Sequence, residues 1–219
     1  MLSGNTSMSG AGGIANGGGA TANISNTTIS GNVNSGFQGG GIINDGTLTL
    51  SNSTVAGNSA DGRGGGIHEG SLGSLNVINT IIANNAGGNC SIFSGSFVSL
   101  GHNLSNDTSC PLSASGDLVN TDPQLGPLQD NGGPTLTHAL QPGSPAIDAI
   151  PVGACTDKYG NPITTDQRGV VRPQGSACDI GAFETESATV ATPIPIPNLS
   201  LWGVVAMAGL MATTLLWQR

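Results

Sequence analysis

The acid and base groups that we consider in the N-terminal half of this chain are few. They are one base, Arg63, and three acids, Asp45, Asp61 and Glu69. A polysaccharide lyase needs a base to take the proton next to a carboxylate, and a hydrolase needs two carboxylates about 5 to 9.5 Å apart. Repeat spacing places Glu69 near Asp45, which would make a small acidic patch. We expect a solvated turn there and no catalytic centre.

A second charged group lies near the C-terminal end of the folded sequence. It consists of Asp148, Asp166, Arg168, Arg172 and Asp179. We expect these residues to form a structural charge network. A calcium site built from aspartates and backbone carbonyls is the alternative. We interpret His138 as a structural residue that makes hydrogen bonds, and otherwise expect no cofactor.

The four cysteines fall into two local pairs, Cys90 with Cys110 and Cys155 with Cys178. Reduced thiols and metal ligands are the competing interpretations, but no CxxC spacing occurs and the histidines are scattered. We expect two disulfides. Each would close a loop of roughly 20 residues and stabilise the fold by about 3 kcal/mol. Disulfides indicate an oxidising compartment.

The composition argues against two classes of protein, disordered chains and nucleic-acid-binding proteins. Glycine accounts for 36 of 219 residues, and only 8% of the residues are charged. Disordered chains combine low hydrophobicity with many charges, whereas 37% of this chain is apolar. The net charge is −8, with Lys158 as the single lysine, so no basic patch is available for nucleic acid.

A phrase that ends in asparagine repeats along residues 1–88. Its central apolar residues recur at spacings of 27, 26 and 27 residues, at Leu2, Ile29, Val55 and Ile82. The asparagines that follow are Asn5, Asn32, Asn58 and Asn85. Other columns in the same register are Ala22, Leu48 and Leu75; Ile24, Leu50 and Val77; and Asn26, Asn52 and Asn79.

Within each repeat, apolar residues alternate in twos over short β-branched runs, which is typical of half-buried strands. A period of 20 to 50 residues indicates a solenoid whose units become stable only when stacked. With three short strands per unit, a parallel β-helix fits best. Like residues would then stack about 4.8 Å apart, with aliphatic columns inside and asparagine amides bonded from turn to turn. We expect glycine where the chain turns with positive φ.

The glycine-rich GGI and GGGI elements and the phrases ending in asparagine resemble bacterial surface proteins with pectin-lyase-like β-helices, including polymorphic outer-membrane protein repeats. The resemblance covers about residues 1–95. It implies a right-handed β-helix, in keeping with the handedness of parallel crossovers. Some members of this group are enzymes that cleave acidic polysaccharides.

Residues 117–184 contain DNGGPT, PGSPAID, DQRG and CDIGAFE. This stretch resembles the choice-of-anchor domain of type Q, which lies between a β-helix and a C-terminal anchoring signal and has no catalytic role. A Pro-rich segment without repeats also suits a plug over the last, otherwise open, turn of a solenoid. We therefore expect a cap.

The C-terminal end contains a Pro-rich linker, residues 185–198, and an uncharged apolar run, Leu199 to Trp217. As a helix, its 19 residues would reach about 28 Å, enough to cross a bilayer core. Trp202 and Trp217 suit the two interfaces, and Arg219 would place the C-terminus in the cytoplasm. We expect a transmembrane helix.

The start of this run resembles the IPTL-CTERM sorting signal. The matching positions, with the terminal arginine, are Ile196, Pro197, Leu199, Ser200, Trp202, Gly203 and Arg219. Asn198 and Leu201 depart from the motif. The resemblance implies recognition and cleavage by an exosortase-like membrane protease.

Residues 1–20 have no basic and apolar segments typical of a signal peptide, so we expect this chain to be the C-terminal part of a longer exported protein. Four parts are expected: coils at 1–88, last coils and cap at 89–184, linker at 185–198 and anchor at 199–217. We predict a noncatalytic, adhesin-like display stalk on the cell surface, with an unknown surface or glycan ligand. The alternative is a carbohydrate-active enzyme with its active site upstream.

Overall fold

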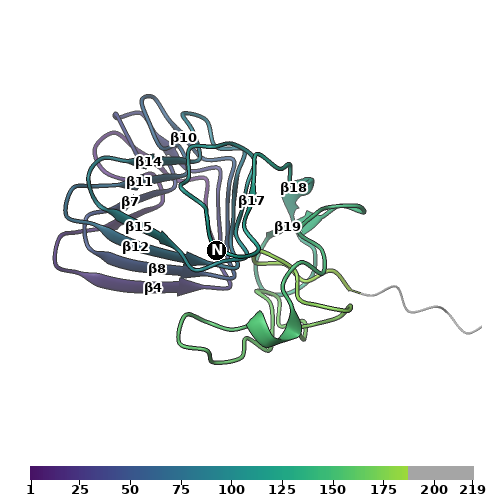
Figure 1. Ribbon diagram of the computed structural model, residues 1–219. Helices are drawn as coiled ribbons and strands as arrows, with labels where there is room; N and C mark the ends of the chain where they lie inside the picture. The colour runs from purple at the N-terminus through teal and green to yellow at the C-terminus, as the bar shows by residue number, and fades with distance from the viewer. Residues whose placement is uncertain (187–219) are drawn as a thin grey trace, which may run out of the picture. The chain divides into compact units, whose positions relative to one another are not determined.

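The structure is a computed structural model that describes residues 1–186 of the chain. The regular structure of these residues consists of nineteen short strands and one 3₁₀ helix, η1 (Val152–Ala154). Most strands belong to four parallel sheets through which the chain winds about four times (Figure 1). The prediction of an all-β parallel solenoid is confirmed.

The four sheets are numbered here in the order in which the chain visits them in one turn. Sheet I contains β3 (Ile14–Asn16), β7 (Ile42–Asn44), β11 (Ile67–Glu69) and β14 (Cys90–Ile92). Sheet II contains β4 (Thr21–Ser25), β8 (Thr47–Ser51), β12 (Ser74–Ile78) and β15 (Ser96–Ser99). Sheet III contains β1 (Leu2–Ser3), β5 (Thr28–Ser30), β9 (Thr54–Ala56), β13 (Ile81–Ala83), β16 (Leu104–Ser105) and β17 (Leu118–Val119). Sheet IV contains β2 (Thr6–Ser7), β6 (Val33–Asn34) and β10 (Ser59–Ala60).

The strand register confirms the sequence columns. In sheet III, Leu2 pairs with Ile29, Ile29 with Val55, and Val55 with Ile82. Sheet II pairs the columns headed by Ala22 and Ile24 in the same way. Translation by one repeat therefore places a like side chain at the same corner of the next turn, and the apolar columns fill the interior of the β-helix, called the bore below.

The number of strands per turn differs from the prediction. The turns that start at β3 and β7 visit four sheets and not three, because the two-residue strands β6 and β10 of sheet IV follow the turn asparagines. A strand of two residues is too short for an apolar alternation to show in the sequence.

An asparagine ladder runs along one corner of the β-helix, as predicted. The side-chain amide of Asn5 donates to Oδ1 of Asn32 at 2.8 Å, Asn32 to Asn58 at 2.9 Å, and Asn58 to Asn85 at 3.0 Å. The ladder continues from Asn85 to Asn89 at 3.0 Å. These bonds satisfy polar groups that face the bore, where water does not compete.

Glycine has two different roles at the corners. Gly31, which precedes a ladder asparagine, has the expected positive φ of 64°. Gly40 and Gly65 have no such φ; a Cβ on either would overlap backbone atoms of the adjacent turn. The expectation that glycine allows turns with positive φ is confirmed at Gly31, and close approach between turns is a second reason for glycine in the GGGI elements.

The last turn of the bore is closed by the segment that precedes β17. Cys110 and Leu112 are buried in the same apolar cluster as the bore residues. The predicted disulfide between Cys90 and Cys110 is present and joins this segment to sheet I. The end plug is therefore this disulfide loop.

Residues 120–186, called the lateral region below, lie against the side of the β-helix (Figure 1). They contain the antiparallel pair β18 (Leu125–Gln129) and β19 (Thr137–Leu140), and the predicted disulfide between Cys155 and Cys178. Hydrogen bonds tie the region to successive turns, from Thr28 Oγ1 to Gln167 Oε1 (2.8 Å), between Ser30 Oγ and His138 Nε2 (2.9 Å), and from Ala182 N to Thr54 Oγ1 (3.1 Å).

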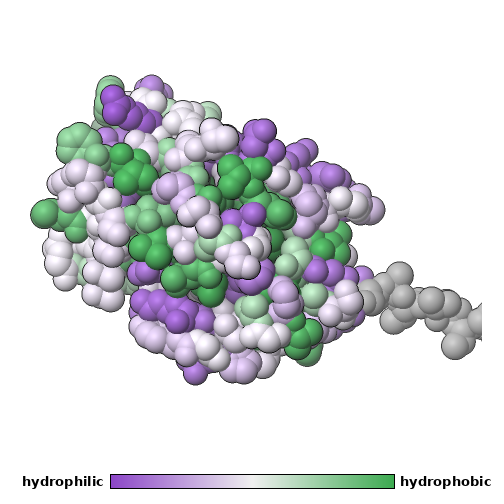
Figure 2. Space-filling model, in the orientation of Figure 1, coloured by the Kyte–Doolittle hydropathy of each residue, from purple (hydrophilic) through white to green (hydrophobic). Residues whose placement is uncertain are grey.

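The expectation of a plug over the last coil is therefore wrong for this region. The outward side chains of sheet III explain its position. Ile81 and Ala83 face away from the bore and share a second buried cluster with Ile150 and Ile180 of the lateral region. Figure 2 shows that the hydrophobic residues left on the visible surface form separate groups.

The predicted anchor helix at 199–217 and nearly all of the predicted linker lie outside the described residues. Within residues 1–186, no helix has the length and apolar character needed to span a membrane.

Candidate functional site

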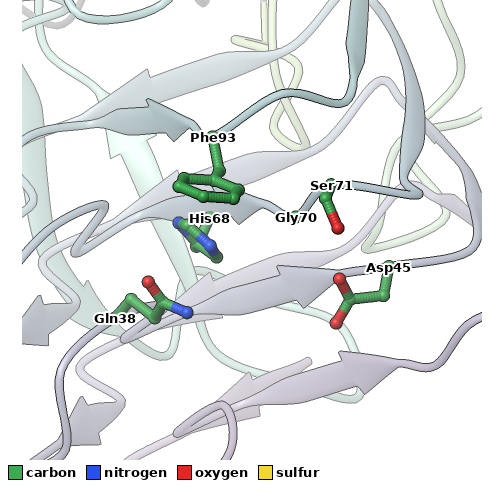
Figure 3. Close-up of a pocket in the computed structure, with 6 residues that line it drawn as sticks. All are labelled: Gln38, Asp45, His68, Gly70, Ser71 and Phe93. Carbon is green, nitrogen blue, oxygen red and sulfur yellow. The ribbon is translucent and has the colours of Figure 1, made fainter.

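A pocket of about 270 Å³ lies on the outer side of sheet I (Figure 3). Its lining residues come from three successive turns and are Gln38, Asp45, His68, Gly70, Ser71 and Phe93. Of these, only Asp45 belongs to the acidic group considered from the sequence. The pocket therefore adds residues that sequence reasoning had not placed together.

Strand alternation in β11 decides which side chains reach the pocket. Ile67 belongs to the bore cluster, so His68 faces outward and Glu69 faces inward again. The pairing partners of His68 on the turns before and after are Ile43 and Ser91. The outward position that His68 occupies is therefore filled by a different residue type on each of these turns.

His68 is deeply enclosed for an outward residue, with 4% of its surface exposed. No hydrogen bond joins its imidazole to another residue within 1–186, and its Nδ1 is buried without a partner. Burial lowers the pKa of His68, opposed by Asp45 and reinforced by Arg63. The ring is therefore a neutral, unpaired polar group at neutral pH.

Phe93 stands over this imidazole on the loop after β14. Its backbone N–H donates to the carbonyl of Glu69 at 2.9 Å, which fixes the start of the loop against β11. The side chain is 71% exposed. Figure 3 shows the phenyl ring beside His68, with Ser71 and Asp45 toward the other end of the pocket.

Asp45 follows β7 directly and reaches the pocket because Gly70, on the next turn, has no side chain. A Cβ on Gly70 would overlap the Asp45 carboxylate. Gln38 lies at the other edge and pairs through its backbone with Arg63 of the next turn. Arg63 itself is exposed and lies over the ring of Phe37, 5.9 Å from its centroid.

Glu69 is buried inside the bore, so the expectation of a solvated turn is wrong. Its two carboxylate oxygens accept from the amide of Asn44 at 3.1 and 3.0 Å, and Asn16 donates to Asn44 at 2.7 Å. Glu69 thus ends a second, shorter amide ladder. Burial raises the pKa of Glu69 to about 7, opposed by the Asn44 hydrogen bond, and nearby Asp45 raises it further.

The two acids that the sequence placed side by side therefore face different spaces. The Asp45 side chain lines the pocket, and the Glu69 side chain enters the bore. Their charges still interact, but the backbone of sheet I separates the groups. Asp45 is the one carboxylate among the residues that line this pocket.

The predicted charge network lies in the lateral region, but its ion pairs differ in part from those expected. Arg168 Nε contacts Asp166 at 2.9 Å as expected. Arg172 pairs with Glu184 at 3.0 Å, a residue that sequence reasoning did not include. The Asp179 carboxylate accepts from the backbone N–H of Asp148 at 2.8 Å, and the Asp148 carboxylate accepts from that of Ala177 at 2.9 Å. Both aspartates therefore hold backbone segments in place.

His138 has the structural role expected of it, because both ring nitrogens are bonded, to Ser30 at 2.9 Å and to the carbonyl of Gly126 at 2.7 Å. Among residues 1–186, no group of three or more His, Cys, Asp or Glu is arranged to hold a metal ion. The predicted sorting residues, from Ile196 to Arg219, lie outside the described residues.

Comparisons with protein-family models, curated proteins and solved structures found no match to this chain. The fold and the pocket are therefore the basis for the function proposed below. Neither His68 nor Phe93 belongs to a sequence motif. The one sequence feature that could have drawn attention to Phe93 is the rarity of its residue type, because the chain has only four phenylalanines.

Proposed function

We propose that this chain is the noncatalytic display part of a bacterial cell-surface protein, a stalk that presents side chains on the outside of a β-helix. The observation that carries the proposal is the contrast between inner and outer columns. Inside sheet I, Ile14, Ile42 and Ile67 repeat from turn to turn. Outside, Ala15, Ile43, His68 and Ser91 differ at each turn.

This contrast supports display because the bore along sheet I needs only the inner columns of that sheet. The outer positions are free to change without loss of the bore, so a surface suited to a ligand can vary on a constant scaffold. Structural columns and variable outward positions are what a presenting surface requires.

The two disulfides support an extracytoplasmic location, since such bonds persist in oxidising compartments. The tail adds to the proposal from sequence alone. An uncharged 19-residue run at 199–217 would anchor the protein in the membrane until an exosortase-like protease removes the segment.

The arrangement of acids supports the noncatalytic part of the proposal. A hydrolase of the two-carboxylate type needs both groups to face the same sugar, and the pocket is lined by Asp45 alone. The second candidate function is a carbohydrate-active enzyme, and the observation that favours it is that the imidazole of His68 and the carboxylate of Asp45 line the same pocket.

The main proposal is tested in the native bacterium with an epitope-tagged gene. We expect a membrane-impermeant label to modify the protein on intact cells, and both cysteine pairs to resist alkylation until a reductant is added. Reduced cysteines in a cytosolic fraction would contradict the proposal.

The enzyme alternative is tested by incubating the purified protein with polyuronates and neutral polysaccharides. We expect no new reducing ends and no unsaturated products. Turnover that disappears in both Asp45→Asn and His68→Gln would support the enzyme instead.

A further inference from the structure

We infer that the pocket on sheet I binds one neutral sugar residue of a glycan, with Phe93 stacked on the ring and Asp45, Gln38 and Ser71 bonded to its hydroxyls. This inference rests on the proposed function, because it names the ligand class that the display surface takes. Four properties of the pocket support it.

The first property is an unsatisfied polar group. The imidazole of His68 lines the pocket, is 4% exposed, and has no hydrogen-bond partner within the described residues. Buried polar groups are nearly always bonded, and an unpaired one costs free energy in the absence of a ligand. A hydroxyl bound in the pocket would give the ring a partner.

The second property is an aromatic ring held outside the core. Phe93 is 71% exposed in a chain with only 3% aromatic residues, and its backbone is tied to β11. A pyranose ring has a face of C–H groups and a rim of hydroxyls. The first suits an aromatic face, and the second suits polar side chains around it.

The third property is the set of polar groups at the edge. The Asp45 carboxylate accepts hydrogen bonds, the Gln38 amide donates and accepts, and the Ser71 hydroxyl does both. Sugar hydroxyls also donate and accept, so they match this mixed edge. An ammonium or a phosphate would match only part of it.

The fourth property is the charge and size of the pocket. Asp45 and the net charge of −8 disfavour an anionic sugar. A volume of about 270 Å³ is slightly below the range of drug-sized ligand pockets, which starts at about 300 Å³. The pocket therefore holds one ring, and the rest of the glycan extends along the β-helix surface.

The test uses the full chain, with its disulfides formed, in a detergent without a sugar headgroup. Saturation-transfer NMR is recorded with the methyl glycosides of glucose, galactose, mannose and N-acetylglucosamine, and with galacturonate and glucosamine as charged probes. We expect at least one neutral glycoside to bind with a Kd on the order of 1 mM, typical of a single weakly held ring.

Variants locate the binding. Phe93→Ala and Asp45→Asn should each weaken it at least about tenfold, whereas Tyr159→Ala should leave it unchanged. Tyr159 is a matched control, because it is also 71% exposed and lines a different pocket. Thermal unfolding of each variant checks that the fold is intact.

The inference is overturned if no neutral glycoside binds to the folded protein, if Tyr159→Ala weakens binding as much as Phe93→Ala, or if only glucosamine binds. These outcomes leave the surface-labelling result untouched, so the display function stands or falls separately. Cleavage of a bound glycan would instead contradict the noncatalytic part of the proposed function while the pocket assignment stands.

Discussion

At the scale of single residues, Glu69 is a carboxylate enclosed in a bore of amides and aliphatic side chains. Its position follows from β11, where a residue two places after Ile67 must face the same way. The Asn44 amide donates to both carboxylate oxygens and so reduces the free-energy cost of burying them. A sequence spacing placed this acid near Asp45 but could not say on which side of the strand each would lie.

We predict that Glu69 makes the fold less stable as pH rises. Its folded pKa of about 7 lies above the unfolded value of 4.5, so its contribution is complete below pH 4.5 and is lost as pH rises through 7. The loss amounts to about 3 kcal/mol if the whole shift is expressed. Urea unfolding of wild type and Glu69→Gln from pH 4 to 8 measures it.

The variant should lack most of this fall, because a glutamine still accepts from Asn44 and does not ionise. Asp61→Asn, at an exposed acid, serves as the control and should follow the wild type. Parallel curves for wild type and Glu69→Gln would show that the pH dependence comes from another group.

The asparagine ladder makes a second prediction, which depends on position within the ladder. Asn58→Ala removes the side-chain bonds to both neighbouring turns and leaves the buried backbone N–H of Asn32 without its acceptor, at a cost of about 2 to 4 kcal/mol. Asn5→Ala, at the exposed end, should cost under about 1 kcal/mol. Chemical denaturation compares the two, and equal losses would mean that the ladder adds little to stability.

At the scale of elements, the sequence predicted the strands well where their apolar alternation was long enough. The five-residue strands of sheet II lie in the predicted register, whereas the two-residue strands of sheet IV were missed. Two residues are too few for an apolar alternation to indicate side-chain direction. The only sequence feature that marks a strand of sheet IV is the ladder asparagine that precedes it.

We predict that the glycines of the GGGI elements are needed for contact between turns. Gly65→Ala places a Cβ against the backbone of Ala86, so the turns must separate, and we expect a loss of about 3 kcal/mol or more. Gly17→Ala is the matched control, since nothing lies within 4 Å of its Cβ position. Thermal melts of both variants test this.

A loss at Gly17 equal to that at Gly65 would show that the effect does not come from close approach between turns. An unchanged melting temperature for Gly65→Ala would mean that the two turns can move apart without penalty.

At the scale of the whole molecule, the two disulfides stabilise different parts of the fold. Cys90–Cys110 holds the segment that closes the bore, and Cys155–Cys178 lies within the lateral region. The Cys90→Ser/Cys110→Ser variant should lose about 3 kcal/mol, and hydrogen exchange should rise first in residues 104–119. The Cys155→Ser/Cys178→Ser variant should raise exchange in residues 152–178 instead.

If both variants opened the same segment, the lateral region and the bore would unfold as one cooperative unit. That outcome would contradict the assignment of separate roles, although it would leave the disulfide pairing itself unchanged.

The sequence alone determined the repeat, the bore columns, the asparagine ladder and the cysteine pairs. These features follow from translation by one turn or from short loops, so they are visible in the order of residues. Only the tertiary structure decided that residues 120–186 pack beside the β-helix, that Glu69 faces the bore, and that His68 and Phe93 share a pocket. These three features depend on contacts with residues that are distant in the sequence. Such residues come from another turn or from more than 100 positions away, as in the hydrogen bond between Thr28 and Gln167.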